Sequence, residues 1–250
     1  MRVALPGSDS TGVYWLCRIL WGTSVNDKHA VTLSGEAPTV FLVDDDDDVR
    51  ESLEQLLRSV GMKASAFSRG EALIDAFEGG TIRSPACIVL DVRLRGASGL
   101  MVQRALSQRG IAHPIIFITG HGDIVMTVKA MKAGAVNFLT KPVRDQDLLE
   151  AIAEAVDLDR RRMADVAAAQ DIRSRWLELT PRQRQVMHFV ACGASNREIA
   201  DELGITEITV KIYRGEGMRR LGTKTLSEFL SKAEILGIVD GTVHDLLNAN

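Results

Sequence analysis

The sequence has few cysteines, no excess of charge of one sign and no long apolar run, and each shortage excludes a class of protein. Its three cysteines are scattered and form no CxxC pair, which argues against a disulfide scaffold or a zinc site and fits a reducing compartment. Thirty basic residues against 33 acidic ones give a net charge of −3, so any surface for nucleic acid must be local. The apolar stretch Val13–Trp21 contains Arg18 and is far shorter than the ~20 residues of a membrane span.

This stretch also lacks the cationic, apolar and small-residue order of a secretory signal. Hydrophobic residues make up 46% of the chain and charged residues 25%, which is typical of globular domains. A chain of 250 residues is long enough for one large domain or two small ones. We therefore expect a cytoplasmic protein without a membrane partner.

Residues 1–37 show no sustained period of 2 or 3.6, so they have no pattern that could bury a core. We interpret them as an N-terminal extension that is disordered or lies upstream of the true start. No methionine occurs between Met1 and Met62, which leaves open a start at a non-methionine codon near Val31.

Residues 38–160 alternate short apolar runs with helical patterns. Four runs rich in β-branched and aromatic residues are typical of buried parallel strands, and a weaker, alternating run suits a strand nearer a sheet edge. The four runs are 40–43, 86–90, 115–118 and 135–139, and the weaker one is 62–67. The helical patterns are 49–60, 72–77, 100–106, 124–131 and a longer one from 145. This alternation predicts an α/β domain with a doubly wound five-stranded parallel sheet.

Polar residues follow four of these runs and predict a site for phosphoryl transfer. Asp44 and Asp45 follow the run 40–43, and Asp91 follows the run 86–90. Thr119 follows the run 115–118, and Lys141 comes shortly after the run 135–139. Strand ends share one edge of a parallel sheet, where clustered carboxylates favour a hard divalent cation such as Mg²⁺. Asp91 would be the nucleophile that forms an aspartyl phosphate, which Lys141, the cation and the Thr119 hydroxyl would hold.

The acidic run that begins at Asp44 has a second interpretation, because acids at a helix start are favoured by the helix dipole. We apply that interpretation to Asp46, Asp47 and Asp48. It does not explain why an acid, a hydroxyl and a Lys-Pro pair each follow a different apolar run.

In these motifs the chain resembles the receiver domain of bacterial two-component response regulators over roughly residues 38–160. The matching motifs are Val43–Asp45, Leu90–Arg93 with Gly99 downstream, Ile118–Gly122, Met131–Ala135 and Lys141–Pro142. The run from Thr119 to Gly134 is most similar to the FixJ/StyR/TodT-like group.

The resemblance implies a role for each site residue. It makes Asp91 the phosphoacceptor and Lys141 the lysine that contacts the phosphate, with a cis bond to Pro142. It implies an Mg²⁺ ion bound by Asp91, by Asp45 directly and by Asp44 through water. The backbone carbonyl of Arg93 is the remaining ligand that it implies.

The resemblance also implies a switch and shows one departure. Thr119 and Phe138 resemble the pair that couples phosphorylation to the face formed by the fourth helix, the fifth strand and the fifth helix. The family usually has Met-Pro after the position of Arg93, whereas this chain has Leu94 and Arg95. We expect a freer and more positive loop beside the phosphoacceptor, with the chemistry intact and an effect on phosphoryl lifetime or partner choice.

A helical pattern continues past Arg162 to near Trp176, and its charged, Ala-rich part at 161–174 predicts a linker. Thr180 is a candidate N-cap with Pro181 at the first helical position, which predicts the start of an all-helical domain. We place a four-helix domain at 175–238 and a tail at 239–250.

Residues 196–221 fit a helix-turn-helix. Ala200 is small where two helices would cross, Gly204 suits a turn that needs a positive φ, and Val210 would pack the second helix onto the first. The other expected core positions are Ile199, Leu203, Ile205, Ile212 and Leu221. A plain helical bundle with a charged face would have the same spacing. The longer match, which includes Leu179-Thr180, Arg182, Gly193, Asn196–Ala200, Leu203-Gly204 and Thr209–Lys211, resembles the LuxR-type output domain.

The second helix of this motif would be the recognition helix in a DNA major groove. The side chains expected to contact DNA are Thr206, Thr209, Lys211, Tyr213, Arg214, Arg219 and Arg220. Three features depart from the family pattern: Gln183 replaces a Glu, Tyr213 replaces a common His, and two glycines lie in the recognition helix. Gly215 and Gly217 each cost about 1 kcal/mol relative to Ala, so we expect a weak second half of that helix.

Together the two resemblances imply a two-component response regulator that accepts a phosphoryl group from a sensor histidine kinase, dimerises and binds promoter DNA. They favour activation of transcription and RNA polymerase as a further partner, and they imply a regulator rather than an enzyme. Two alternatives stay open: an Mg²⁺-dependent aspartyl-phosphate phosphatase or phosphotransferase, and a DNA-binding protein independent of phosphorylation. Val92 and Arg93 after Asp91 count against the first alternative, which needs a second acid in an Asp-x-Asp motif.

Overall fold

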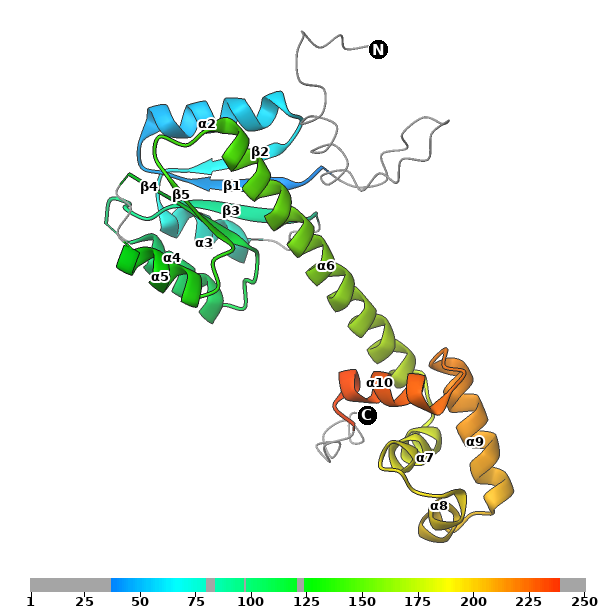
Figure 1. The fold of residues 1–250 in the computed structure, drawn as a ribbon. Helices are drawn as coiled ribbons and strands as arrows, with labels where there is room; N and C mark the ends of the chain where they lie inside the picture. The colour runs from blue at the N-terminus through cyan, green and yellow to red at the C-terminus, as the bar shows by residue number, and fades with distance from the viewer. Residues whose placement is uncertain (1–36, 80–83, 97, 121–123, 239–250) are drawn as a thin grey trace, which may run out of the picture. The chain divides into compact units, whose positions relative to one another are not determined.

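The computed structural model describes residues 37–79, 84–96, 98–120 and 124–238. The expectations for the N-terminal extension and for the tail at 239–250 lie outside these ranges. The chain divides into two compact units between Met163 and Ala164 (Figure 1). Within the described ranges, no helix is both long and apolar enough to cross a membrane.

The first unit contains a five-stranded parallel sheet in the order β2-β1-β3-β4-β5. Its strands are β1 (Thr39–Val43), β2 (Lys63–Phe67), β3 (Ala86–Asp91), β4 (Ile115–Thr119) and β5 (Asn137–Thr140). The five-stranded parallel sheet is confirmed, and β2 lies at an edge as its weak alternating pattern predicted. The predicted fifth strand began two residues too early, because Ala135 and Val136 belong to the connection that follows the positive-φ turn at Gly134.

Helices cover both faces of the sheet, which makes it doubly wound (Figure 1). One face packs on α2 (Asp47–Ser59) and on the first part of α6 (Asp145–Leu177) through the core residues Leu57, Leu148 and Ile152. The other face packs on α3 (Gly70–Glu78), α4 (Gly99–Gln108) and α5 (Ile124–Lys132), with Leu73, Val102 and Ala130 in the core. Asp46 caps α2 through its side chain, and Asp47 and Asp48 lie in the first turn, as the helix-start interpretation predicted.

A buried carboxylate, Asp159, joins α6 to the end of the sheet opposite the acidic edge. The side chain is fully buried and accepts hydrogen bonds from the Ala86 N–H at 2.9 Å, from His113 Nδ1 at 3.1 Å and from Arg162 Nε at 2.8 Å. The sequence analysis assigned no role to Asp159 or His113, because a charged residue within a charged stretch gives no sign that it is buried.

We expect Asp159→Ala to lower the free energy of unfolding of the first unit by about 3 kcal/mol at neutral pH, because it leaves buried donors unpaired. Burial alone raises the pKa of Asp159, but the hydrogen bonds from His113 and Ala86 outweigh it and hold the pKa below its ordinary value of 3.8. A lowered folded-state pKa adds stability that is complete above the ordinary pKa and is lost as the pH falls through the folded pKa. Urea unfolding of wild type and variant should therefore converge as the pH falls below about 4.

Asp157→Ala is the matched control, since Asp157 lies on the same helix but its side chain is 31% exposed and pairs with the surface residues Arg160 and Arg161. We expect it to cost less than about 1 kcal/mol at any pH. Equal losses of unfolding free energy in the two variants would show that the burial of Asp159 does not increase its contribution to stability.

The second unit contains four helices in its described part: α7 (Pro181–Ala191), α8 (Asn196–Leu203), α9 (Glu207–Arg220) and α10 (Leu226–Leu236). The last turns of α6 also belong to its core through Ile172 and Trp176. Gly204 ends α8 at φ 63°, and Ala200 and Val210 are buried between α8 and α9, so the predicted helix-turn-helix is confirmed.

One predicted core position is wrong. Ile212 is 54% exposed, whereas Ile199 and Leu221 are fully buried and Leu203 and Ile205 are partly buried against the core. Position 212 lies on the face of α9 that turns away from α7 and α8, and the apolar side chain alone could not reveal this.

Two departures from the family pattern have structural reasons. Gln183 completes a capping box with Thr180 and also donates from Nε2 to Glu216 of α9, which a glutamate at 183 could not do. Gly217 is buried where α9 crosses α7, and a Cβ there would lie 2.6 Å from Met187 Sδ. Gly217 therefore allows a close helix contact, which offsets its cost to the helix.

Candidate functional site

The acids at the carboxyl ends of β1 and β3 meet at one edge of the sheet, as the strand order requires. Val43 pairs with Phe67 on one side and with Leu90 on the other, so Asp44 and Asp91 extend from neighbouring strands. Both side chains are buried, with 3% and 7% of their residue surfaces exposed. The Asp44 N–H donates to the Phe67 carbonyl at 3.2 Å, which fixes the chain just past the strand.

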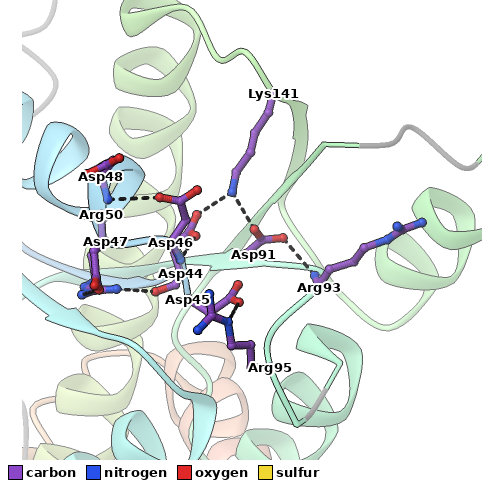
Figure 2. Close-up of polar contacts among 10 residues, drawn as sticks. All are labelled: Asp44, Asp45, Asp46, Asp47, Asp48, Arg50, Asp91, Arg93, Arg95 and Lys141. Atoms are coloured by element: carbon purple, nitrogen blue, oxygen red, sulfur yellow. Dashed lines mark hydrogen bonds and ion pairs between the residues drawn. The ribbon is translucent and has the colours of Figure 1, made fainter.

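Lys141 joins the two acids. Its Nζ lies 2.7 Å from Asp44 Oδ2 and 2.6 Å from Asp91 Oδ2 (Figure 2). Burial alone lowers the pKa of Lys141, but the hydrogen bonds to the two carboxylates outweigh it and the pKa is raised. Burial raises the pKa of Asp44, although the Lys141 contact and the hydrogen bond from the Asp46 N–H oppose this. The lysine is thus held as a cation between two carboxylates, and its peptide bond to Pro142 is cis.

Asp45 completes an acidic cluster with Asp44 and Asp91. Carboxylate oxygens of the three residues lie within 4.8 Å of one another. Hard oxygen donors at this spacing fit the chemistry of Mg²⁺. The opposite oxygen of Asp91, Oδ1, accepts from the Arg93 N–H at 2.9 Å, which turns the loop after β3 around the acid. Asp45 Oδ2 lies 3.0 Å from Arg95 Nε, a contact that the sequence did not predict beyond the added positive charge.

Thr119 and Phe138 lie on the neighbouring strands β4 and β5. Thr119 is fully buried at the end of β4, and its carbonyl accepts from the Lys141 N–H at 2.7 Å. Phe138 is partly buried against the core, with its ring centroid 6.4 Å from that of Phe117. The backbone of the predicted switch threonine is therefore in direct contact with the backbone of Lys141, the lysine predicted to contact the phosphate.

Gly99 lies close to the backbone of Asp91 and leaves no room for a side chain. We therefore expect Gly99→Ala to destabilise the first unit by about 2 kcal/mol. An alanine Cβ would lie 2.4 Å from the Asp91 carbonyl oxygen and 3.1 Å from Phe117 Cε1. Because one of these atoms is backbone, the variant must move Asp91 itself. The temperature of thermal unfolding and the rate of phosphorylation by acetyl phosphate should both fall.

Gly96→Ala tests whether a nearby glycine has the same effect by conformation alone. Gly96 has φ 92°, and no atom lies within 4 Å of the point that an alanine Cβ would occupy, so its cost should come from backbone strain and leave Asp91 in place. A full phosphorylation rate in Gly99→Ala would contradict the proposed steric link to Asp91.

The second candidate site is the outer face of α9. Thr206 caps the helix, and its Oγ1 accepts from the Thr209 N–H at 3.2 Å. Lys211 and Arg219 are exposed, and Arg220 is exposed while its Nη1 donates to the Glu178 carbonyl at 2.7 Å. This face is consistent with a helix that lies in a groove of DNA.

Residues 40–153 match the response regulator receiver domain family, and residues 177–233 match the bacterial regulatory proteins of the luxR family. Nodulation protein W of Bradyrhizobium diazoefficiens is 46% identical over 199 residues, which cover 80% of this chain and 86% of that protein. The chain is a two-component response regulator of the FixJ/NarL type. Transcriptional regulatory protein FixJ of the same species is 37% identical over 201 residues, covering 80% and 97% of the two chains. The solved structure of response regulator StyR aligns with a TM-score of 0.67 at 40% identity, covering 80% of this chain and 99% of that one.

In this response regulator the residues predicted to contact DNA are not all exposed, and Thr209 is half-buried. Tyr213 is half-buried and packs against the core of the second unit, so only part of it faces outward. Arg214 is also half-buried, and its Nη1 donates to Asn196 Oδ1 at 3.3 Å. Ile208 and Ile212, which the sequence analysis did not assign to DNA, are instead 71% and 54% exposed. A large apolar side chain on a solvent face has no distinct sequence signal, since core residues share its composition.

Proposed function

We propose that a sensor histidine kinase phosphorylates Asp91 and that the phosphorylated regulator binds promoter DNA and activates transcription. The observation that carries this proposal is the contact of Lys141 Nζ with both Asp91 and Asp44 beside Asp45. One cation and three carboxylates at the end of a parallel sheet suit phosphoryl transfer, which depends mainly on positioning and charge neutralisation. Because its proposed target is promoter DNA, we propose that the protein acts in the cytoplasm.

The chain's own residues account for the transfer. A carboxylate oxygen of Asp91 attacks the phosphorus of a phosphohistidine, the P–O bond forms as the P–N bond breaks, and the leaving imidazole nitrogen takes a proton from solvent water. Lys141 would neutralise charge on the phosphoryl oxygens, and the Arg93 N–H would hold the carboxylate in place. Mg²⁺ bound by Asp44, Asp45, Asp91 and the Arg93 carbonyl would supply further charge neutralisation at the same oxygens.

A groove beside Lys141 supports binding of the kinase partner on this side of the domain. It has a volume of about 560 Å³ and lies between α2 and the segment that follows β5. Its lining residues are Asp48, Val49, Ser52, Leu53, Ile118, Lys141, Pro142, Val143 and Asp145. The mixture of apolar and acidic side chains is suited to a helix of a kinase partner whose phosphohistidine lies next to Asp91.

Phosphorylation would reach the output domain through Thr119 and Phe138. The added charge would draw the Thr119 hydroxyl toward the phosphoryl group, and Phe138 could then turn inward and bias the neighbouring helix and strand face toward a symmetric dimer. Two output domains would then bind two half-sites, and contact with RNA polymerase would follow from that position.

We expect Thr119→Ala to accept the phosphoryl group but to dimerise about tenfold more weakly than wild type. The variant lacks the hydroxyl that would move toward the phosphoryl group. Sedimentation with and without acetyl phosphate and Mg²⁺ measures this directly. Ser107→Ala is a control for loss of a hydroxyl elsewhere in the unit, because Ser107 is exposed on α4, which does not belong to the face expected to dimerise. Unchanged dimerisation in Thr119→Ala would exclude a switch that depends on this hydroxyl.

A mobility-shift titration of promoter fragments, with and without acetyl phosphate and Mg²⁺, tests the proposal against its alternatives. A phosphorylated regulator should bind more tightly than the untreated protein. Equal binding in both states would favour the phosphorylation-independent DNA-binding protein. Absence of DNA binding together with turnover of acetyl phosphate would favour the phosphatase.

A further inference from the structure

The loop after β3 places a basic side chain on one of the three clustered acids. Arg95 Nε lies 3.0 Å from Asp45 Oδ2, and Figure 2 shows the guanidinium turned toward this carboxylate. The family usually has a proline at this position, which could not make such a contact. Asp44 and Asp91 are paired with Lys141, so each acid of the cluster contacts a cationic side chain.

We propose that Arg95 competes with Mg²⁺ for Asp45 and so sets the metal affinity of the site. This inference rests on the proposed function, because it takes the acidic cluster to be the Mg²⁺ site. Mg²⁺ binds carboxylate oxygens at about 2.0–2.1 Å. A dication at that distance from Asp45 Oδ2 would lie close to the guanidinium, and the two positive charges would repel each other. Binding of the metal therefore requires Arg95 to leave.

Arg95 is able to leave at little cost. Its side chain is 84% exposed, whereas that of Asp45 is 21% exposed. Gly96, which follows it, has a positive φ, and no atom lies within 4 Å of the point that a Cβ there would occupy. An exposed ion pair contributes at most about 1 kcal/mol, which corresponds to about a fivefold change in affinity. Arg95 is thus a reversible competitor and not a permanent block.

The other basic residues close to the acids are engaged elsewhere. Arg50 donates from Nη1 to the backbone carbonyl of Asp44 at 2.8 Å and pairs with Asp47. Lys141 contacts Asp44 and Asp91. Arg95 is therefore the cation that the described residues place on the Asp45 carboxylate.

Calorimetric titration of the full-length chain with MgCl₂ at constant ionic strength tests the proposal without any phosphorylation. We expect Arg95→Gln to bind Mg²⁺ about three- to fivefold more tightly than wild type. Arg95→Pro, which restores the usual family residue, should show the same gain by a different side chain. Arg69→Gln is the matched control, since Arg69 is exposed, follows β2 at the same sheet edge and makes no ion pair with the acids among the described residues.

The possible results separate this inference from the proposed function. Tighter binding in both Arg95 variants and unchanged binding in Arg69→Gln support the competition. Equal affinity of wild type and the Arg95 variants overturns it while leaving the Mg²⁺ site intact, and an equal gain in Arg69→Gln overturns it in favour of net charge alone. If neither wild type nor any variant binds Mg²⁺, the proposed function of the cluster fails and the inference falls with it.

Discussion

The Asp91→Asn protein is expected to take up no phosphoryl group from acetyl phosphate and Mg²⁺, whereas the wild type should take up one. An amide cannot replace the carboxylate oxygen that attacks phosphorus, and no other described acid both ends a strand and contacts Lys141 at 2.6 Å. The variant should stay folded, since an Asn Oδ1 can still accept the Arg93 N–H. Intact-mass spectrometry counts the phosphoryl groups, and sedimentation follows the dimer.

Asp48→Asn is the control for loss of a carboxylate from the acidic run. Asp48 is exposed in the first turn of α2 and does not belong to the three-acid cluster. We expect it to be phosphorylated and to dimerise like wild type. Phosphate-dependent dimerisation that persists in Asp91→Asn would exclude Asp91 as the phosphoacceptor.

The acidic edge was predictable because topology alone determines it. Five apolar runs separated by helices require parallel strands, and parallel strands bring their carboxyl ends together whatever the side-chain details. Asp44 and Asp91 follow buried runs directly and Lys141 follows β5, so their approach needed no knowledge of rotamers. The structure adds the distances and the order of the strands.

Contacts that depend on where a side chain turns could not be predicted in the same way. Asp159 is fully buried in a stretch rich in arginine, and its partner His113 is 46 residues away in the sequence. Arg95 reaches Asp45 across a loop whose path depends on local backbone angles. In both cases the residue type suggested an exposed charge, and only the fold supplied the partner.

The recognition helix shows the same limit for apolar residues. Ile212 and Val210 are both β-branched and both lie in the helix-turn-helix, yet one is 54% exposed and the other is fully buried. Their positions differ by two residues on a helix, so they point in different directions. The exposed stripe that contains Ile208, Lys211 and Ile212 is the face on which DNA readout would depend.

Replacement of Lys211 by alanine is expected to weaken binding to promoter DNA about tenfold, since a lost charge-assisted contact in the groove costs ~1–3 kcal/mol. Lys211 is exposed at the centre of this stripe, and among the described residues it has no hydrogen-bond or ion-pair partner. The melting temperature of the second unit should therefore not change. Fluorescence anisotropy at several salt concentrations measures both the affinity and the salt slope.

The salt slope decides what Lys211 contacts. If it contacts a phosphate, Lys211→Ala should weaken binding to all sequences alike and reduce the slope by about one unit. If it contacts a base, the loss should be confined to one position of the site. Lys211→Arg keeps the charge and should retain most of the affinity in the first case.

Ile208→Ala provides a second comparison, because an exposed isoleucine that contacts a thymine methyl group should affect sequence preference while leaving the slope unchanged. Normal binding by Lys211→Ala would show that α9 does not enter the groove by this face.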